Sequence, residues 1–345
     1  MTINVIIVDD SAVVRQVLTD VINKAPDMKV SDVANDPIFA YTKMQKRWPD
    51  VIVLDIEMPR MDGITFLKQI MAERPTPVVI CSSLAQSGAE VSIQALEAGA
   101  FDIVSKPKLG IKDFLESADN NIVSMIRAAA IAKVGVKSID LYRPIHEKPK
   151  RPQKTNQLEN NKRLTAIGCS TGGTTALEFV LTQLTIDCPG IVIVQHMPKN
   201  FTKAFAERLN SLCEIEVLEA SSGDSITPGK ALIAPGGKHL QVKRSRGEFI
   251  TIVTEGPAVN RHCPSVDVLF KSIAQNVQEY ATGVLMTGMG NDGAKGLLAM
   301  KNAGCTTLVQ DEQSSVVFGM PKEAIKLGAA KHILNLNDIA AYMNE

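Results

Sequence analysis

The first third of the chain alternates short runs of apolar residues with longer amphipathic stretches. The apolar runs predict strands at residues 4–8, 29–33, 50–55, 77–81 and 103–105, and the stretches between them predict helices. Runs that are apolar throughout indicate strands buried on both faces, as in a parallel sheet covered by helices. Five such units within about 120 residues predict a flavodoxin-like α/β domain with a five-stranded parallel sheet, in which sites gather at the carboxyl ends of the strands.

A second α/β pattern begins near residue 164. It predicts strands at 164–167, 190–194, 231–234, 248–253, 283–286 and 306–309, and helices at 174–184, 201–211, 265–276 and 293–302. This alternation indicates another doubly wound, mostly parallel α/β domain. The segment between the two patterns is rich in Pro, Lys, Asn and Gln, which favours a solvated linker over a nucleic-acid or membrane contact. The predicted domains are therefore 1–122 and 163–345, joined by a linker at 123–162.

Composition narrows the class of protein. The chain has 345 residues and equal numbers of basic and acidic side chains, 37 of each, which argues against a large basic footprint for nucleic acid. The amino-terminal residues lack the pattern of a secretory signal, and no apolar run reaches the ~20 residues needed to cross a bilayer. The six cysteines are scattered without metal-like spacing. These features predict a cytoplasmic protein with reduced thiols and no membrane insertion.

Acidic residues end two predicted strands of the first domain. Asp9 and Asp10 follow the first strand, and Asp55 ends the third. Adjacent strands of a sheet lie about 5 Å apart, so the three carboxylates converge and favour binding of Mg²⁺. Ser82 follows the fourth strand and Lys106 the fifth, which adds a hydroxyl and an ammonium that can hold a phosphoryl product. Taken singly, each residue is equally well explained as a solvated strand end or a salt bridge.

With all five at successive strand ends, residues 1 to about 120 resemble the response-regulator receiver family. The pairs Met58-Pro59, Asp62-Gly63 and Lys106-Pro107 stand where the family pattern places them. The resemblance implies phosphorylation by a histidine kinase with Mg²⁺ as cofactor. The residues that it implies are the phosphoacceptor Asp55, the magnesium ligands Asp10, Asp55 and the backbone carbonyl of Glu57 with Asp9 nearby, and the switch residues Ser82 and Lys106.

In the second domain, a Gly- and Ser-rich turn follows the first strand. Gly168, Ser170 and Gly172 have the spacing of a nucleophile elbow, in which a sharp strand-to-helix turn exposes a serine. The start of the following helix would stabilise a developing oxyanion. The same turn fits phosphate binding equally well. Cys169 is a rival nucleophile, but we expect its side chain to point away from the elbow and to serve as a packing thiol.

A serine nucleophile needs a base, and the chain holds five histidines. His196 follows a buried strand, as Ser170 does, and Asp292 follows a third such strand and can orient the imidazole. Read as local structure alone, residues 290–293 form a turn and a helix cap. The order Ser, His, Asp differs from that of α/β-hydrolases, which argues against that fold but not against the triad. The other histidines are predicted to be packing or surface residues: His146, His239, His262 and His332.

Residues from about 162 to 345 resemble the catalytic domain of the chemotaxis protein-glutamate methylesterase (CheB) family. The matching stretches are IGCSTGG, VQHMP, NRHCPSVDVLF, LMTGMGNDGA and VVFGMPKEAI. The resemblance implies hydrolysis of γ-glutamyl methyl esters on chemoreceptors with release of methanol, often with deamidation of glutamines, and no cofactor in this domain. The residues that it implies are the nucleophile Ser170, the base His196, the orienting acid Asp292, and the backbone amides of Thr171 and Met289 as oxyanion hole.

Two positions depart from the pattern expected of that family. Cys169 and Cys263 stand where alanine and a basic residue are expected. The departures leave the triad intact, but Cys263 bears on the contacts with substrate.

We also expect the unphosphorylated receiver to sit over the Ser170 cleft and phosphorylation of Asp55 to loosen that contact.

Two other classes of function compete with this interpretation. A DNA-binding response regulator predicts a helix-turn-helix with a basic recognition helix, whereas the second half is rich in strands and near neutral. A phosphate- or nucleotide-binding module built on GCSTGG predicts no role for His196 or Asp292. The absence of the GxxxxGK[ST] motif weakens that alternative.

Overall fold

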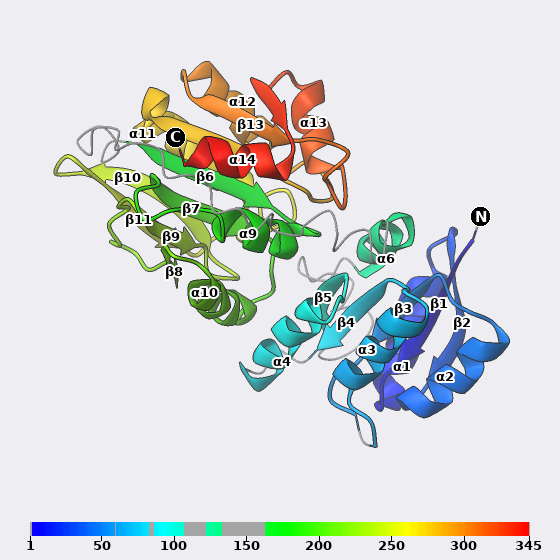
Figure 1. The fold of residues 1–345 in the computed structure, drawn as a ribbon. Coiled ribbons are helices and arrows are strands. Elements are labelled where there is room, and N and C mark those ends of the chain that lie inside the picture. Colours follow the sequence, from blue (N-terminus) through cyan, green and yellow to red (C-terminus); the bar gives the residue numbers. More distant parts are fainter. Residues whose placement is uncertain (1, 59, 83–85, 107–121, 133–162, 345) are drawn as a thin grey trace. The chain divides into compact units, whose positions relative to one another are not determined.

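The computed structural model describes residues 2–58, 60–82, 86–106, 122–132 and 163–344. The chain divides into two compact units, one within residues 1–140 and one within 141–345, and each is described by itself (Figure 1). Pro59, Pro107, His146 and most of the predicted linker lie outside the described residues. No helix in the described ranges is long and apolar enough to span a membrane.

The first unit is a five-stranded parallel sheet in the order β2-β1-β3-β4-β5, as the sequence predicted for a flavodoxin-like domain. Its strands are β1 (Ile3–Val8), β2 (Met28–Ala34), β3 (Val51–Leu54), β4 (Val78–Ser82) and β5 (Asp102–Ser105). Its helices are α1 (Ala12–Asn23), α2 (Pro37–Lys46), α3 (Gly63–Glu73), α4 (Gln86–Glu97) and α6 (Ile122–Ile131). Because β3 is buried along its whole length, it reads as a continuous apolar run.

Helix α6 lies where the sequence placed the start of the linker. Its residues Ile126 and Ala129 are fully buried and belong to the same apolar cluster as Val5 and Ile7 of β1. The polar linker composition begins only after this helix, so the helix packs on the core of the first unit and is not part of a solvated linker.

The second unit is built on a seven-stranded parallel sheet in the order β14-β13-β12-β6-β7-β9-β8. Its strands are β6 (Leu164–Cys169), β7 (Gly190–Gln195), β8 (Glu216–Glu219), β9 (Lys230–Ile233), β12 (Ala281–Leu285), β13 (Thr306–Gln310) and β14 (His332–Leu334). Its helices are α9 (Gly173–Leu181), α10 (Phe201–Leu212), α11 (Val266–Asn276), the 3₁₀ turn Gln278–Tyr280, α12 (Ala294–Asn302), α13 (Met320–Lys326) and α14 (Leu336–Met343).

The strand predicted at 248–253 is not part of this sheet. It forms β11 (Glu248–Thr254), which pairs antiparallel with β10 (His239–Ser245) in a separate hairpin beside the main sheet (Figure 1). The hairpin packs on α11 through buried residues such as Leu240 and Val242.

The order of strands fixes where a site can form. Strand β6 lies at the centre, and the chain runs outward from it through β7 on one side and through β12 on the other. A reversal of this kind opens a crevice outside the carboxyl ends of the central strands. The loops after β6, β7 and β12 therefore meet at one edge, and these are the loops that carry Ser170, His196 and Asp292.

Candidate catalytic site and acidic pocket

The first unit carries an acidic pocket at the carboxyl ends of its strands. Asp9 and Asp55 are buried, with 1% and 2% of their surface exposed, and Asp10 is exposed. One carboxylate oxygen from each lies within 4.8 Å of the others. Lys106 Nζ lies 3.0 Å from Asp9 Oδ2 and 2.7 Å from Asp55 Oδ2. Ser82, buried at the end of β4, belongs to the neighbouring strand.

Among the described residues, the carboxylates of this pocket outnumber the cationic side chains that contact them. Burial raises the pKa of Asp55 to about 6, although the contact with Lys106 opposes the rise. Burial likewise raises the pKa of Asp9. For Lys106, burial lowers the pKa, but the contacts with Asp55 and Asp9 outweigh it and the net pKa is raised. Three carboxylates facing one ammonium, in a site with hard oxygen donors, fit a divalent cation such as Mg²⁺.

In the second unit, the turn after β6 presents Ser170. The Ser170 N–H donates to the Thr287 carbonyl at 3.0 Å, and the Ser170 carbonyl accepts from the Gly173 N–H at 2.7 Å. Gly172 has a φ of 75°, and a Cβ there would collide with Val316, so only glycine fits this turn. The sharp turn from strand to helix predicted from the glycine spacing is present.

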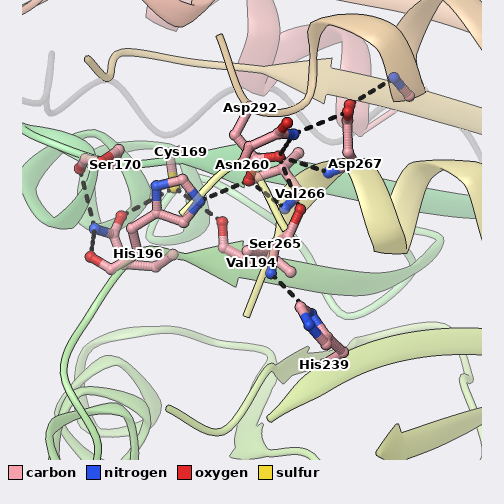
Figure 2. Close-up of polar contacts among 12 residues, drawn as sticks. Cys169, Ser170, Val194, His196, His239, Asn260, Ser265, Val266, Asp267 and Asp292 are labelled. Atoms are coloured by element: carbon pink, nitrogen blue, oxygen red, sulfur yellow. Dashed lines mark hydrogen bonds and ion pairs between the residues drawn. The ribbon is translucent and has the colours of Figure 1, made fainter. Parts of the chain in front are cut away.

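His196 and Asp292 meet at the crevice. His196 Nε2 lies 2.9 Å from Asp292 Oδ2 (Figure 2). The carboxylate can only accept, so Nε2 carries the hydrogen and Nδ1 is the accepting nitrogen of the ring. Nδ1 is buried and, among the residues that the structure describes, has no hydrogen-bond partner. Cys169 of β6 pairs with Gln195 of β7, which places Ser170 and His196 side by side as the next residues of adjacent strands.

The structure brings His196 and Asp292 into contact but does not join Ser170 to the base. Among the described residues, no hydrogen-bond partner exists for Ser170 Oγ. Catalytic hydrogen bonds are often long without substrate and tighten in the complex. The accepting Nδ1 of His196 is therefore the candidate acceptor for the Ser170 proton.

Asp292 is buried, with 1% of its surface exposed, and receives several further donors. These are Asn260 Nδ2 at 2.7 Å, Ser265 Oγ at 2.8 Å, Val266 N at 2.7 Å and Asp267 N at 3.2 Å. Burial alone would raise its pKa, but the contacts with His196, Asn260 and Ser265 hold the pKa well below the usual value. The Asp292 carboxylate lies next to the first turn of α11 and accepts from its amides. The helix dipole favours negative charge there, so the carboxylate stays ionised at neutral pH.

His262, predicted to be a packing or surface residue, lies against His196. Its ring stacks on that of His196 with centroids 3.7 Å apart and planes 7° apart. Burial and the neighbouring His196 lower the pKa of His262 to about 3, against the opposing charge of Asp292. A neutral ring of this kind restricts rotation of His196 without competing for its proton. The only sequence signal for it was its place in the NRHCPSVDVLF stretch.

The predicted oxyanion amides are available. Within the described ranges, neither the Thr171 N–H nor the Met289 N–H donates to an acceptor. Gly288, which precedes Met289, packs directly against Ser170, since a Cβ on it would lie 2.8 Å from Ser170 Cβ. Amides that are free and close to a nucleophile are what an oxyanion site requires.

The Cys169 side chain lies in the interior, against Gln195 and Gly173. It is fully buried, its thiol donates to Gln195 Oε1 at 3.1 Å, and burial raises its pKa (Figure 2). A buried thiol with a raised pKa is inert as a nucleophile, in agreement with the packing role expected of it. Sequence reasoning did not single out Gln195, although it stands in VQHMP.

Comparisons with known proteins agree on both units. Residues 165–343 match the family model described as CheB methylesterase, and residues 5–118 match that of the response regulator receiver domain. Protein-glutamate methylesterase/protein-glutamine glutaminase 2 of Chromobacterium violaceum is 57% identical and covers 99% of each chain. The Hahella chejuensis protein of the same name is 55% identical, covering 98% of this chain and 94% of its own. The crystal structure of the Thermotoga maritima CheB methylesterase catalytic domain is 37% identical, covers 53% of this chain and 97% of that one, and has a TM-score of 0.52.

Proposed function

The chain belongs to the CheB methylesterase family, and from this membership we propose the reaction, its residues and its control. The protein is a protein-glutamate methylesterase and protein-glutamine glutaminase that carries a receiver domain. It removes methyl groups from γ-glutamyl esters of chemoreceptors as methanol and deamidates receptor glutamines. The receiver is taken as residues 1 to about 131 and the catalytic domain as 163–345, and the protein acts in the cytoplasm.

The observation that carries the catalytic assignment is the contact of His196 with Asp292 beside Ser170, with Nδ1 of His196 left as acceptor. Ser170 Oγ attacks the ester carbonyl while His196 Nδ1 takes its proton, and Asp292 stabilises the resulting imidazolium. The amides of Thr171 and Met289 hold the oxyanion. Methanol, or ammonia from a glutamine, leaves with the proton from His196. Water then gives a proton to His196 and attacks the glutamyl-enzyme, and His196 passes that proton to Ser170 Oγ as the glutamate is released.

The acidic pocket supports regulation by phosphorylation. Asp55 accepts a phosphoryl group from a histidine kinase, and Lys106 follows the added charge. Ser82 supplies the switch hydroxyl. Mg²⁺, when bound, offsets the negative charge that phosphoryl transfer brings together. The groups that would hold it are Asp10, Asp55 and the backbone carbonyl of Glu57, with Asp9 nearby.

The test is methanol release from methyl-esterified receptor membranes, with and without a small phosphodonor and Mg²⁺. Release should rise with the donor, and Ser170→Ala should lower the rate by roughly 10⁴- to 10⁶-fold, as the loss of other triad serines does. A Cys169→Ala variant treated in the same way should lose no more than a few-fold in rate. If Ser170→Ala released methanol at the rate of the unchanged protein, the nucleophile would be wrong. If no preparation released methanol, a phosphate-binding role for the elbow would replace esterase activity.

A further inference from the structure

A buried glutamine links the nucleophile to the base through their main chains. Gln195 is the last residue of β7, and 1% of its surface is exposed. Its Nε2 donates to the Ser170 carbonyl at 3.0 Å and to the His196 carbonyl at 3.0 Å. One amide group therefore spans the two strand ends on which the reaction depends.

The orientation of this amide is set from its other side. Gln195 Oε1 accepts from the Cys169 thiol at 3.1 Å. It also packs against Gly173, where an added Cβ would collide with Oε1. A rotated amide would place its oxygen against two carbonyl oxygens and its nitrogen against the thiol, so the orientation with two donated bonds is the favoured one.

The two carbonyls depend on Gln195 to different degrees. The Ser170 carbonyl also accepts from the Gly173 N–H at 2.7 Å. For the His196 carbonyl, Gln195 Nε2 is the sole donor among the described residues. A carbonyl that loses its donor in a buried site turns toward any other donor or toward water. That rotation of the peptide would carry the His196 side chain with it.

We propose that Gln195 is a positioning residue for ester hydrolysis, and that its amide, oriented by the Cys169 thiol, holds the peptide units of Ser170 and His196 in register. This inference rests on the proposed function. It assigns Gln195 no contact with substrate: the amide acts through the two main chains. Misplacing reacting groups by about 1 Å can cost on the order of 10²-fold in rate, so a link of this kind matters for kcat.

The experiment compares Gln195→Met, which keeps the volume and removes the amide, with Thr307→Val in the full chain. Thr307 is a matched control because it is fully buried, donates to the Ala329 carbonyl at 2.7 Å, and lies near the amino end of β13, away from the crevice. Both variants should lower Tm by similar amounts. Only Gln195→Met should lower kcat for methanol release, by about 10- to 100-fold with KM within about twofold. Equal kcat in the two variants at matched Tm would overturn the proposal.

Variants of Cys169 test the thiol and remain informative if Gln195→Met fails to fold. Cys169→Ala should lower kcat by a few-fold, and Cys169→Ser, which restores a donor to Oε1, should recover it. In a Gln195→Met background, Cys169→Ala should change kcat no further, because the thiol acts through the amide. Unchanged kcat in Cys169→Ala would overturn the part assigned to the thiol. An inactive unchanged protein would instead count against the proposed function.

Discussion

Asp292 shows how one buried carboxylate is kept both charged and fixed. Burying a carboxylate without partners is costly, and here each of its protein donors other than His196 belongs to the segment 260–267. Asn260 is the most exposed of these donors, and its Nδ2 also bonds Asp267 Oδ2 at 3.0 Å. The acid is therefore held by the approach to α11 and not by its own strand.

Replacing Asn260 by glycine should weaken that support. Asn260 has a φ of 52°, which glycine adopts without strain, so Asn260→Gly removes the side chain alone. A hydrogen bond to a charged group contributes about 1.5–3 kcal/mol, and part of this loss should appear as a fall in kcat of about tenfold. The control is Arg246→Gly, since Arg246 has a φ of 50° in the turn between β10 and β11. A tenfold fall in both variants would mean that a general change in stability, not Asp292, is responsible.

His262 predicts a pH dependence of stability. Its pKa is about 3 in the folded protein against the ordinary 6.5, with His196, Asp292 and Arg261 as the charged or titratable groups that act on it. Between these values the unfolded state binds the extra proton, so stability is present above about pH 6.5 and is lost as pH falls toward 3. His262→Phe keeps a ring but cannot be protonated. Thermal unfolding of residues 163–345 between pH 7 and 4 should show a smaller fall in Tm for His262→Phe, and parallel curves would contradict the prediction.

At the scale of elements, α11 and α12 stabilise each other's first turns. Asp292, just before α12, accepts from the first amides of α11, and Asp267 within α11 accepts from the Gly296 N–H of α12 at 2.6 Å. The first amides of a helix have no partner within the helix, and the helix dipole favours a carboxylate there. Each of the two helices thus has its first amides bonded by a carboxylate from beside or within the other helix, and Asp292, the proposed orienting acid, is one of these two carboxylates.

If these carboxylates stabilise the helix ends, neutralising the buried Asp267 should lower the free energy of unfolding more than neutralising an exposed acid at a helix start. Asp267→Asn removes the charge at the start of α12 and should lower the free energy of unfolding by about 1–2 kcal/mol, the upper range for a charge at a partly buried helix end. Asp338→Asn is the matched change at the exposed first turn of α14 and should cost about 0.3–1 kcal/mol. Urea unfolding of the catalytic domain measures both. Equal costs would show that the charge of Asp267 contributes no more than a surface charge.

The strands with the clearest apolar runs are those buried along most of their length. Strands β1, β3, β6 and β7 read as apolar runs because helices cover both sides of them. The sequence-based prediction omitted β8, β10, β14, α13 and α14. The edge strands β8 and β14 expose alternate or most residues, and α13 is only seven residues long, so their apolar periodicity is too short to detect.

The same reasoning separates the predicted site residues from the missed ones. Residues that directly follow buried strands, such as Ser170 and His196, share the edge at which parallel strands end, so their proximity follows from topology. Asn260 lies in a two-residue turn and His262 directly follows it. This turn is far in sequence from His196, on which the His262 ring stacks only in the folded protein. Gln195 ends a strand, but its role depends on where its amide points. Neither a loop path nor a side-chain direction is encoded in local apolar pattern.

At the scale of the whole molecule, phosphorylation of the first unit and ester hydrolysis by the second should differ in their need for a metal. Within the described residues, the one cluster of His, Cys or acidic groups suited to a metal is Asp9, Asp10 and Asp55, and neither His196 nor Asp292 belongs to it. Chelation should therefore abolish stimulation of methanol release by a phosphodonor and leave the basal rate unchanged. Asp55→Asn should behave in the same way with Mg²⁺ present. If chelation lowered the basal rate of both proteins, the catalytic domain would need a metal of its own.

Occlusion of the crevice by the unphosphorylated receiver makes a separate prediction about residues 163–345 alone. The corresponding domain of the Thermotoga maritima relative was crystallised as a separate domain, so this fragment is expected to fold. If the receiver blocks access to Ser170, the fragment should release methanol faster than the unphosphorylated chain, at a rate near that of the phosphorylated chain, and should not respond to the donor. Ser170→Ala in the fragment controls for contaminating esterase. A fragment that matched the unphosphorylated chain would contradict occlusion, and phosphorylation would then have to act by a gain of activity that needs the receiver in place.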